Sequence, residues 1–133
     1  MYLLDTNIVI HFMKDQYPQL TRKLYTFHPS ELLISSVTVF ELEYGAEKSK
    51  WGQRTRNNLA KFLAPFTILP FEAADAIAAG RIRGYLEKNG TKIGPYDVQI
   101  AGQALIRGLT VVTHNTGEFK RVPGLKLEDW TEE

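Results

Sequence analysis

Short apolar runs alternate along the chain with longer segments of helical period. The apolar runs are rich in Leu, Ile and Val and cover residues 2–4, 32–35, 67–69 and 110–113. Each run is followed by a segment with helical periodicity. Strands that are apolar on both faces are typical of a parallel sheet with helices on both sides. The pattern therefore predicts an α/β fold of three layers.

The helical segments cover residues 6–14, 19–27, 37–48, 53–63, 72–88 and 95–107. Several of their ends carry a capping signal: Ser36 can cap the helix at 37, Pro95 suits a first turn, and Gly108 suits a helix exit. A last short strand is predicted near residues 125–127, which gives a mostly parallel sheet of four to five strands. No repeat or linker interrupts the chain, so we expect one domain over residues 1–133.

Composition excludes several classes of protein. The chain has no Cys, which excludes a disulfide framework, Cys-ligated zinc, an iron–sulfur cluster and a thiol nucleophile. No apolar run approaches the ~18–20 residues of a membrane span, and no basic segment precedes Asp5. We therefore expect a cytoplasmic protein without membrane contact. The 16 basic and 15 acidic residues argue against a basic nucleic-acid coat, but they allow a nuclease whose acids are gathered in one place.

Two acidic residues stand at unusual positions. Asp5 ends the first strand directly before a helix, although helix capping alone would explain it. Glu41 lies around its helix from the solvated pair Glu43 and Glu47, and Gly45 leaves space beside it. An edge glutamate whose stem covers apolar surface is the alternative interpretation of Glu41.

The remaining positions of the Glu41 helix are apolar nearly all round. They include Val39, Phe40, Leu42 and Tyr44. A helix that is apolar on most faces is expected to be buried on more than one side.

Asp97 shares one face of its helix with Ile100, Ala101 and Ala104. The helix dipole favours an acid in the first turn by ~0.3–1 kcal/mol, whereas burying an unpaired carboxylate costs several kcal/mol. We therefore expect a positive group next to Asp97.

The last predicted core strand is followed by His114, Asn115 and Glu118. Taken singly, these are ordinary loop residues. Because the carboxyl ends of parallel strands meet at one edge of a sheet, however, this loop should lie beside Asp5. Four acids gathered from separate segments repel one another unless a cation is present, and all-oxygen ligand sets suit Mg²⁺ or Mn²⁺. The residues thus predict metal-dependent cleavage of a phosphodiester or phosphomonoester.

Four segments of the chain resemble PIN-domain nucleases, and more closely the VapC-type toxins of bacterial toxin–antitoxin pairs. They are the opening Leu-Asp-Thr-Asn at residues 4–7, the helix at 35–45, the Gly-Pro-Tyr-Asp segment within 93–101 and the Thr-His-Asn-Thr-Gly-Glu-Phe ending at 113–119. The segment 122–130 is also similar to these toxins. The resemblance implies a PIN-like α/β/α fold.

The resemblance also implies roles for the site residues. Asp5 and Asp97 would be the principal Mg²⁺ ligands, and Glu41 would bind the ion or orient the attacking water. Asn115 and Glu118 would complete the acidic edge of the site. Relatives often carry Asp where this chain has Asn115. Thr6 and Thr113 would orient a carboxylate or a water without binding the metal themselves, although helix capping and strand-end hydrogen bonds explain them equally well.

An endoribonuclease activity on structured RNA such as tRNA is implied, with Mg²⁺ as the cofactor and Mn²⁺ as a substitute. The resemblance also implies a homodimer, a larger toxin–antitoxin assembly, and a cognate VapB-like antitoxin whose tail occupies the acidic edge of the site. Candidate phosphate contacts are Lys48, Lys50, Arg54, Arg56, Arg81, Arg83, Lys92, Lys120 and Arg121. The densest basic stretch, residues 48–56, includes Trp51 and suits RNA by charge and stacking. It suits an antitoxin contact or a plain solvated surface as well.

Three other interpretations fit the sequence less well. A haloacid-dehalogenase-like phosphatase also begins with an Asp after its first strand, but it needs a second acid two residues on, where this chain has Asn7. A dinucleotide-binding domain needs a G-x-G-x-x-G segment after a strand, and the chain has none. A non-catalytic module that binds RNA or a protein would tolerate loss of the acids, all of which are present.

Overall fold

The computed structural model describes residues 1–132, which form seven α-helices, a short 3₁₀ helix and five strands. In chain order these are β1 (Tyr2–Leu4), α1 (Thr6–Met13), α2 (Pro18–Tyr25), the 3₁₀ turn Pro29–Glu31, β2 (Leu32–Ser35), α3 (Ser36–Lys48), α4 (Gly52–Leu63), β3 (Thr67–Leu69), α5 (Ala73–Lys88), α6 (Pro95–Arg107), β4 (Thr110–Val112), α7 (Thr116–Phe119) and β5 (Lys126–Glu128). The six predicted helices all form, within two residues at each end. Helix α7 was not predicted.

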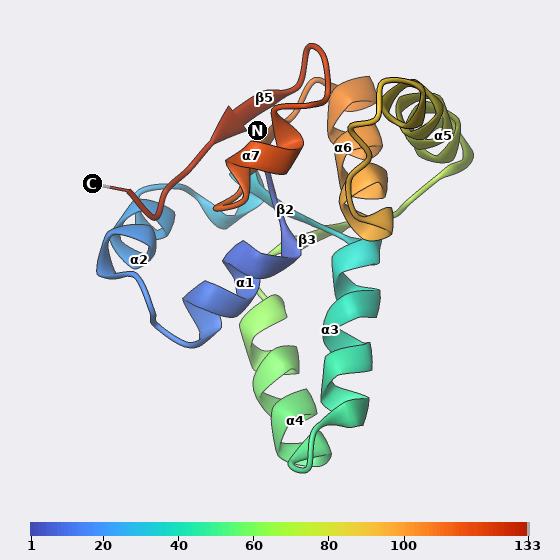
Figure 1. Ribbon diagram of the computed structural model, residues 1–133. Helices are drawn as coiled ribbons and strands as arrows, with labels where there is room; N and C mark the ends of the chain where they lie inside the picture. The colour runs from blue at the N-terminus through green and yellow to red at the C-terminus, as the bar shows by residue number, and fades with distance from the viewer. Residues whose placement is uncertain (133) are drawn as a thin grey trace.

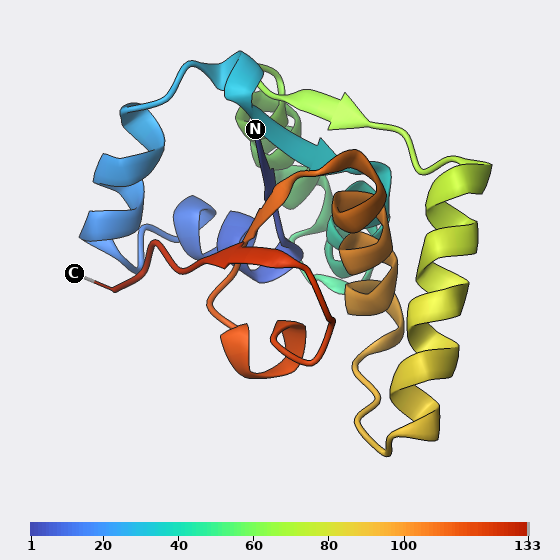
Figure 2. The same cartoon turned by 90° about the horizontal axis from the view of Figure 1, so that it is seen from above.

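The five strands form one sheet in the order β3-β2-β1-β4-β5, and every pairing is parallel. The first strand of the chain lies at the centre, where Leu3 is level with Leu33 of β2 and Val111 of β4. Figure 2 shows the sheet from above, with the paired helices α5 and α6 on one side of it. Parallel strands point the same way, so the residues that follow β1, β2 and β4 meet at one edge.

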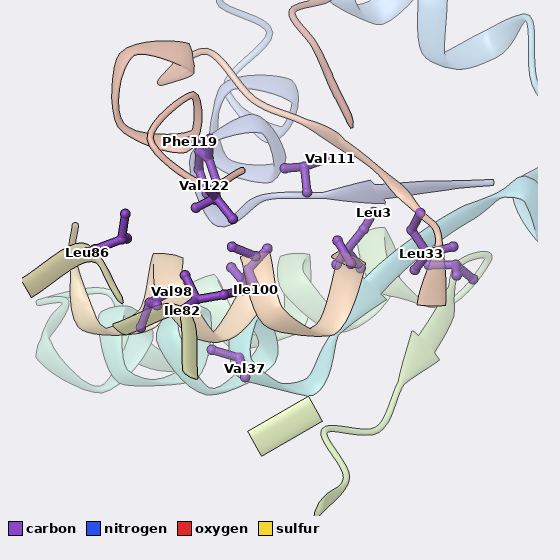
Figure 3. Close-up of a cluster of buried hydrophobic side chains, with 13 residues drawn as sticks. Leu3, Leu33, Val37, Ile82, Leu86, Val98, Ile100, Val111, Phe119 and Val122 are labelled. Atoms are coloured by element: carbon purple, nitrogen blue, oxygen red, sulfur yellow. The ribbon is translucent and has the colours of Figure 1, made fainter. Parts of the chain in front are cut away.

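Successive strand residues bury opposite faces of the sheet, as strand geometry requires. Leu3 belongs to a core cluster between the sheet and the helices α5, α6 and α7, drawn in Figure 3. Leu4 belongs to a second cluster, which packs against α1, α2 and the α3–α4 hairpin. The predicted three-layer α/β architecture with a parallel sheet is confirmed.

Helices α5 and α6 are in very close contact. A Cβ on Gly102 would lie 2.6 Å from the backbone nitrogen of Ala79, so only glycine permits this approach. Asp75, fully buried on α5, accepts hydrogen bonds from Arg107 Nε at 2.9 Å and Nη2 at 3.0 Å. Gln103 Nε2 donates to Pro70 O at 3.0 Å. These contacts fix α6, the helix that carries Asp97 in its first turn (Figure 1).

The N-cap predicted for α3 is one residue off. Ser35, not Ser36, caps the helix, because its Oγ accepts the backbone N–H of Val37 at 3.0 Å. The Ser36 hydroxyl is taken by another partner, since it accepts the N–H of Phe71 at 2.9 Å after β3.

Two predictions of burial are wrong. Phe40 and Tyr44 of α3 are 54% and 58% exposed, although other sides of that helix contact β2, α1, α4 and α6. Strand β3 is not apolar and buried on both faces, since it lies at the sheet edge with Ile68 37% exposed. Across residues 1–132 no helix is both long and apolar enough to span a membrane.

Candidate active site

Asp5 stands at the carboxyl end of the central strand and caps α1. Its Oδ1 accepts the backbone N–H of Ile8 at 2.8 Å, and its Oδ2 accepts the Thr113 hydroxyl at 2.6 Å. The residue is 1% exposed, and this burial raises its pKa to about 6. The hydrogen bonds from Thr113 and Ile8 lower the pKa of Asp5, because they favour the ionised carboxylate. Asp5 is thus a fixed carboxylate whose two oxygens are already oriented.

Glu41 approaches the same edge from α3. The Thr6 hydroxyl lies 2.7 Å from Glu41 Oε1 and 3.0 Å from the hydroxyl of the buried Thr38. A hydroxyl carries one proton and a carboxylate only accepts, so Thr6 donates to Glu41 and accepts from Thr38. Thr6 therefore orients the Glu41 carboxylate, and Thr38, one helical turn before Glu41, supports Thr6.

Asp97 lies half-buried in the first turn of α6. A Cβ on Gly94 would come within 3.2 Å of Asp97 Oδ2, so the carboxylate folds back over the start of its own helix. The pKa of Asp97 is raised to about 7, first by burial and then by the negative charges of Asp5, Glu118 and Glu41 in that order. The four acids therefore act on one another across one edge of the sheet.

Thr113 and Asn115 connect this edge to the β4–α7 loop. The Thr113 hydroxyl, which donates to Asp5, also accepts the backbone N–H of Asn115 at 2.8 Å. Asn115 Nδ2 donates to Glu118 Oε2 at 2.5 Å. The amide at position 115 therefore holds the Glu118 carboxylate.

The acidic rim, defined as Asp5, Glu41, Asp97 and Glu118, fits Mg²⁺ or Mn²⁺. Its ligands are carboxylate oxygens, and their mutual repulsion calls for a cation, as the raised pKa of Asp97 indicates. Among residues 1–132, no three acidic or histidine side chains stand close enough to enclose an ion by themselves. Mg²⁺ does not need such a closed set, because it keeps several waters and uses one or two carboxylates with phosphate oxygens.

The basic candidates divide by position. Lys48 and Lys50 lie at the far tip of the α3–α4 hairpin, where their ammonium groups lie over the rings of Tyr44 and Trp51 at 5.1 and 5.3 Å (Figure 1). Arg56 is not free for phosphate, since its guanidinium pairs with Glu43 at 2.7 Å and with Glu47.

Arg83 and Lys92 lie much closer to the acids. Together with Glu118 and Gly94 they line a hollow of about 330 Å³. The remaining exposed candidates are Arg54, Arg81, Lys120 and Arg121. Arg121 donates to the carbonyl of Lys92 at 2.9 Å.

A larger groove of about 590 Å³ runs between α1, α3 and α4. Glu41 forms part of its wall, and Ile10, Met13 and Phe62 make it largely apolar. Lys14 also lines it, a residue that sequence reasoning did not single out. Its place directly after α1, the helix that Asp5 caps, was the available signal.

Comparison with known proteins agrees with this geometry. Residues 2–125 match the PIN domain family. The chain is 43% identical over 129 residues to the tRNA(fMet)-specific endonuclease VapC of Salmonella typhimurium, covering 97% of each chain. It is 39% identical to Ribonuclease VapC2 of Haemophilus influenzae, again over 97% of each.

Solved structures give the same result. A DNA-bound VapBC from Salmonella typhimurium superposes with a TM-score of 0.91 at 42% identity, over 97% of each chain. VapBC2 from Rickettsia felis, bound to a promoter DNA fragment, gives 0.90 at 35% identity, over 97% of this chain and 98% of that one. With its central parallel sheet and its acidic rim, the chain belongs to the PIN-domain family and, within it, to the VapC ribonucleases of VapBC toxin–antitoxin systems.

Proposed function

We propose that this chain is a Mg²⁺-dependent endoribonuclease toxin that hydrolyses a phosphodiester bond of tRNA. The initiator tRNA is the first substrate to test, because the Salmonella relative is named for it. The observation that carries the proposal is the convergence of four acids at one sheet edge, where hydrogen bonds fix Asp5, Glu41 and Glu118 and their charges act on Asp97. Since tRNA is cytoplasmic, we place the activity in the cytoplasm.

Each residue of the rim has a distinct task in this proposal. When bound, Mg²⁺ would polarise the scissile phosphate and favour ionisation of a water. Asp5 and Asp97 would hold the ion, and Glu118 would contribute from the side where Asn115 holds it. Glu41 is oriented by the hydrogen bond from Thr6, so it is placed to accept a proton from the attacking water.

The antitoxin would act on the same rim. A basic side chain placed among the four acids would replace the charge of the metal and block the site. The apolar groove beside Glu41 would take the apolar face of an antitoxin helix, because Ile10, Met13 and Phe62 line it at the required place.

Incubation of the purified chain with initiator and elongator methionine tRNA transcripts tests the activity. Cleavage is expected with Mg²⁺ or Mn²⁺ and not with EDTA, and Asp97→Asn should abolish it. Glu47→Gln is the matched control, since Glu47 is an acid at the distant hairpin and should not be needed. Full cleavage by folded Asp97→Asn protein, or cleavage in EDTA, would contradict the proposal.

The alternatives give different results in the same experiment. A non-catalytic module would bind the tRNA with every metal and cleave none. A phosphatase would release inorganic phosphate from a 5′-phosphorylated nucleotide and leave the internal bonds of the tRNA intact.

A further inference from the structure

Three rings that the proposed mechanism does not use meet beside the acidic rim. They are His11 on α1, Tyr17 at the start of α2 and His114 in the β4–α7 loop. Their ring centroids lie 5.1 Å apart for His11 and Tyr17, 5.6 Å for Tyr17 and His114, and 6.0 Å for His11 and His114. Each ring thus contacts both others, although they come from three separate segments.

The position of this ring cluster is fixed by the site residues next to it. His114 stands in the chain between Thr113, whose hydroxyl bonds Asp5 at 2.6 Å, and Asn115, whose amide bonds Glu118 at 2.5 Å. His11 is close enough to Asp5 to be among the groups that act on its carboxylate. The cluster therefore lies at the border of the rim.

Hydrogen bonds hold both imidazoles by the same nitrogen. His11 Nδ1 lies 2.6 Å from Gln16 Oε1, an acceptor, so Nδ1 carries the proton. His114 Nδ1 lies 2.8 Å from the Thr131 hydroxyl and 3.3 Å from Asp129 Oδ2. The other nitrogen of each ring, Nε2, is then left as an acceptor. The side chain of His114 is 50% exposed, so the cluster reaches the surface.

Neither imidazole is buried in the core, since His11 is half-buried and His114 is exposed. Tyr17 packs against the second hydrophobic cluster. The three rings offer hydrogen-bond acceptors and lie next to carboxylates that repel phosphate. They therefore suit an uncharged aromatic base better than the phosphate backbone of RNA. Nucleobases have that character, and single-stranded RNA is commonly bound by stacking on Tyr and His rings.

We propose that His11, Tyr17 and His114 form a stacking platform for one unpaired nucleobase of the RNA, next to the bond that the rim cleaves. The inference rests on the proposed ribonuclease function and adds to it how the RNA strand is oriented. Stacking would hold a base in place, and a histidine Nε2 would accept a hydrogen bond from its amino group. The platform thereby favours cleavage in a loop over cleavage in a duplex, where bases are not available to stack.

Binding without cleavage tests the platform separately from the activity. The probe is a short RNA hairpin with 2-aminopurine in its loop, mixed with the wild-type chain in EDTA at low salt. Stacking should quench the 2-aminopurine fluorescence. Tyr17→Ala and His114→Ala should each weaken binding roughly fivefold or more and abolish the quenching. Tyr17→Phe should keep both, and His114→Phe should keep the quenching. Tyr25→Ala, which removes a 77% exposed ring from the other end of α2, is the matched control.

A second measurement needs no variant. A hairpin with 5-iodouridine in the same loop should crosslink under ultraviolet light to a peptide that contains Tyr17 or His114. Crosslinks confined to other peptides, or equal quenching by both alanine variants, would overturn the platform. Binding of the hairpin without quenching would overturn it as well and leave the rings to a protein partner. Failure of the ribonuclease proposal itself would be recognised differently, as the absence of tRNA cleavage in Mg²⁺.

Discussion

The hydroxyl of Thr113 donates a 2.6 Å hydrogen bond to Oδ2 of Asp5, a residue 108 positions earlier in the chain. This bond favours the ionised form of a carboxylate whose burial raises its pKa to about 6. In Thr113→Val the bond is lost and the pKa of Asp5 should rise further. Less of Asp5 is then ionised at neutral pH, so the acidic limb of the pH profile of cleavage should move to higher pH. Thr113→Ser keeps the hydroxyl and should keep the wild-type profile. An unshifted profile in Thr113→Val would show that the bond does not tune Asp5.

The stability of the metal-free protein should fall as pH rises from about 4 to about 7. The folded pKa of Asp97 is about 7 against an ordinary value of 3.8, so in this window the folded chain binds more protons than the unfolded one. Stability decreases with pH wherever that is true. Asp5, raised to about 6, acts in the same direction. Thermal unfolding in EDTA across this range measures the effect.

Asp97→Asn isolates the contribution of that one carboxyl group. The variant removes a charge that burial and three acids disfavour, so in EDTA at neutral pH it should be more stable than the wild type, by on the order of 1 kcal/mol after solvent screening. Mg²⁺ should stabilise the wild type and have little effect on the variant. Equal responses of both proteins to Mg²⁺ would remove Asp97 from the ligand set.

Arg107→Met should destabilise the fold by about 3 kcal/mol, because it leaves the fully buried Asp75 carboxylate without its main partner. Burial alone would raise the pKa of Asp75, but the hydrogen bonds from Arg107 and from the Glu72 backbone lower it instead. The double variant with Asp75→Leu should recover much of the loss, since no charge is then left buried. Urea unfolding of the single and double variants provides the comparison.

The salt dependence of RNA binding should differ between variants of two basic residues, Lys92 and Arg56. Lys92→Ala removes a charge from the hollow that contains Glu118, so it should weaken binding and lower the slope of log affinity against log salt by roughly 0.7–0.9. Arg56→Ala should change the slope little, because Arg56 is already paired with Glu43 and Glu47. The opposite ranking would place the RNA on the α3–α4 hairpin.

Periodicity carried most of the information about the fold. The six longer helices each bury a stripe, and the strands β1, β2 and β4 are largely buried, so their spacing predicted them. Helix α7 was not predicted, because the four residues Thr116–Phe119 are little more than one helical turn and cannot show a periodic pattern. Asp97 could be singled out because an acid on a stripe with Ile100 and Ala101 has no packing explanation.

What depended on contacts across the chain could not be predicted. Ser35 and Ser36 are equally good caps, and only the distant N–H of Phe71 decides between them. The pairing of Arg56 depends on how α4 folds back along α3. The exposure of Phe40 depends on which side of α3 the rest of the chain leaves open.

The strand order also determines when a growing chain can become toxic. The first strand to leave the ribosome is β1, the central one. However, the hydrogen bond that holds Asp5 comes from Thr113, and the fourth acid of the rim is Glu118. Both residues lie in the last quarter of the sequence. Helices α1 to α4 can form earlier, but β1 has one neighbour missing until β4 has been made. We therefore expect catalytic competence to require nearly the whole chain, and prematurely terminated products that end before β4 to lack the activity.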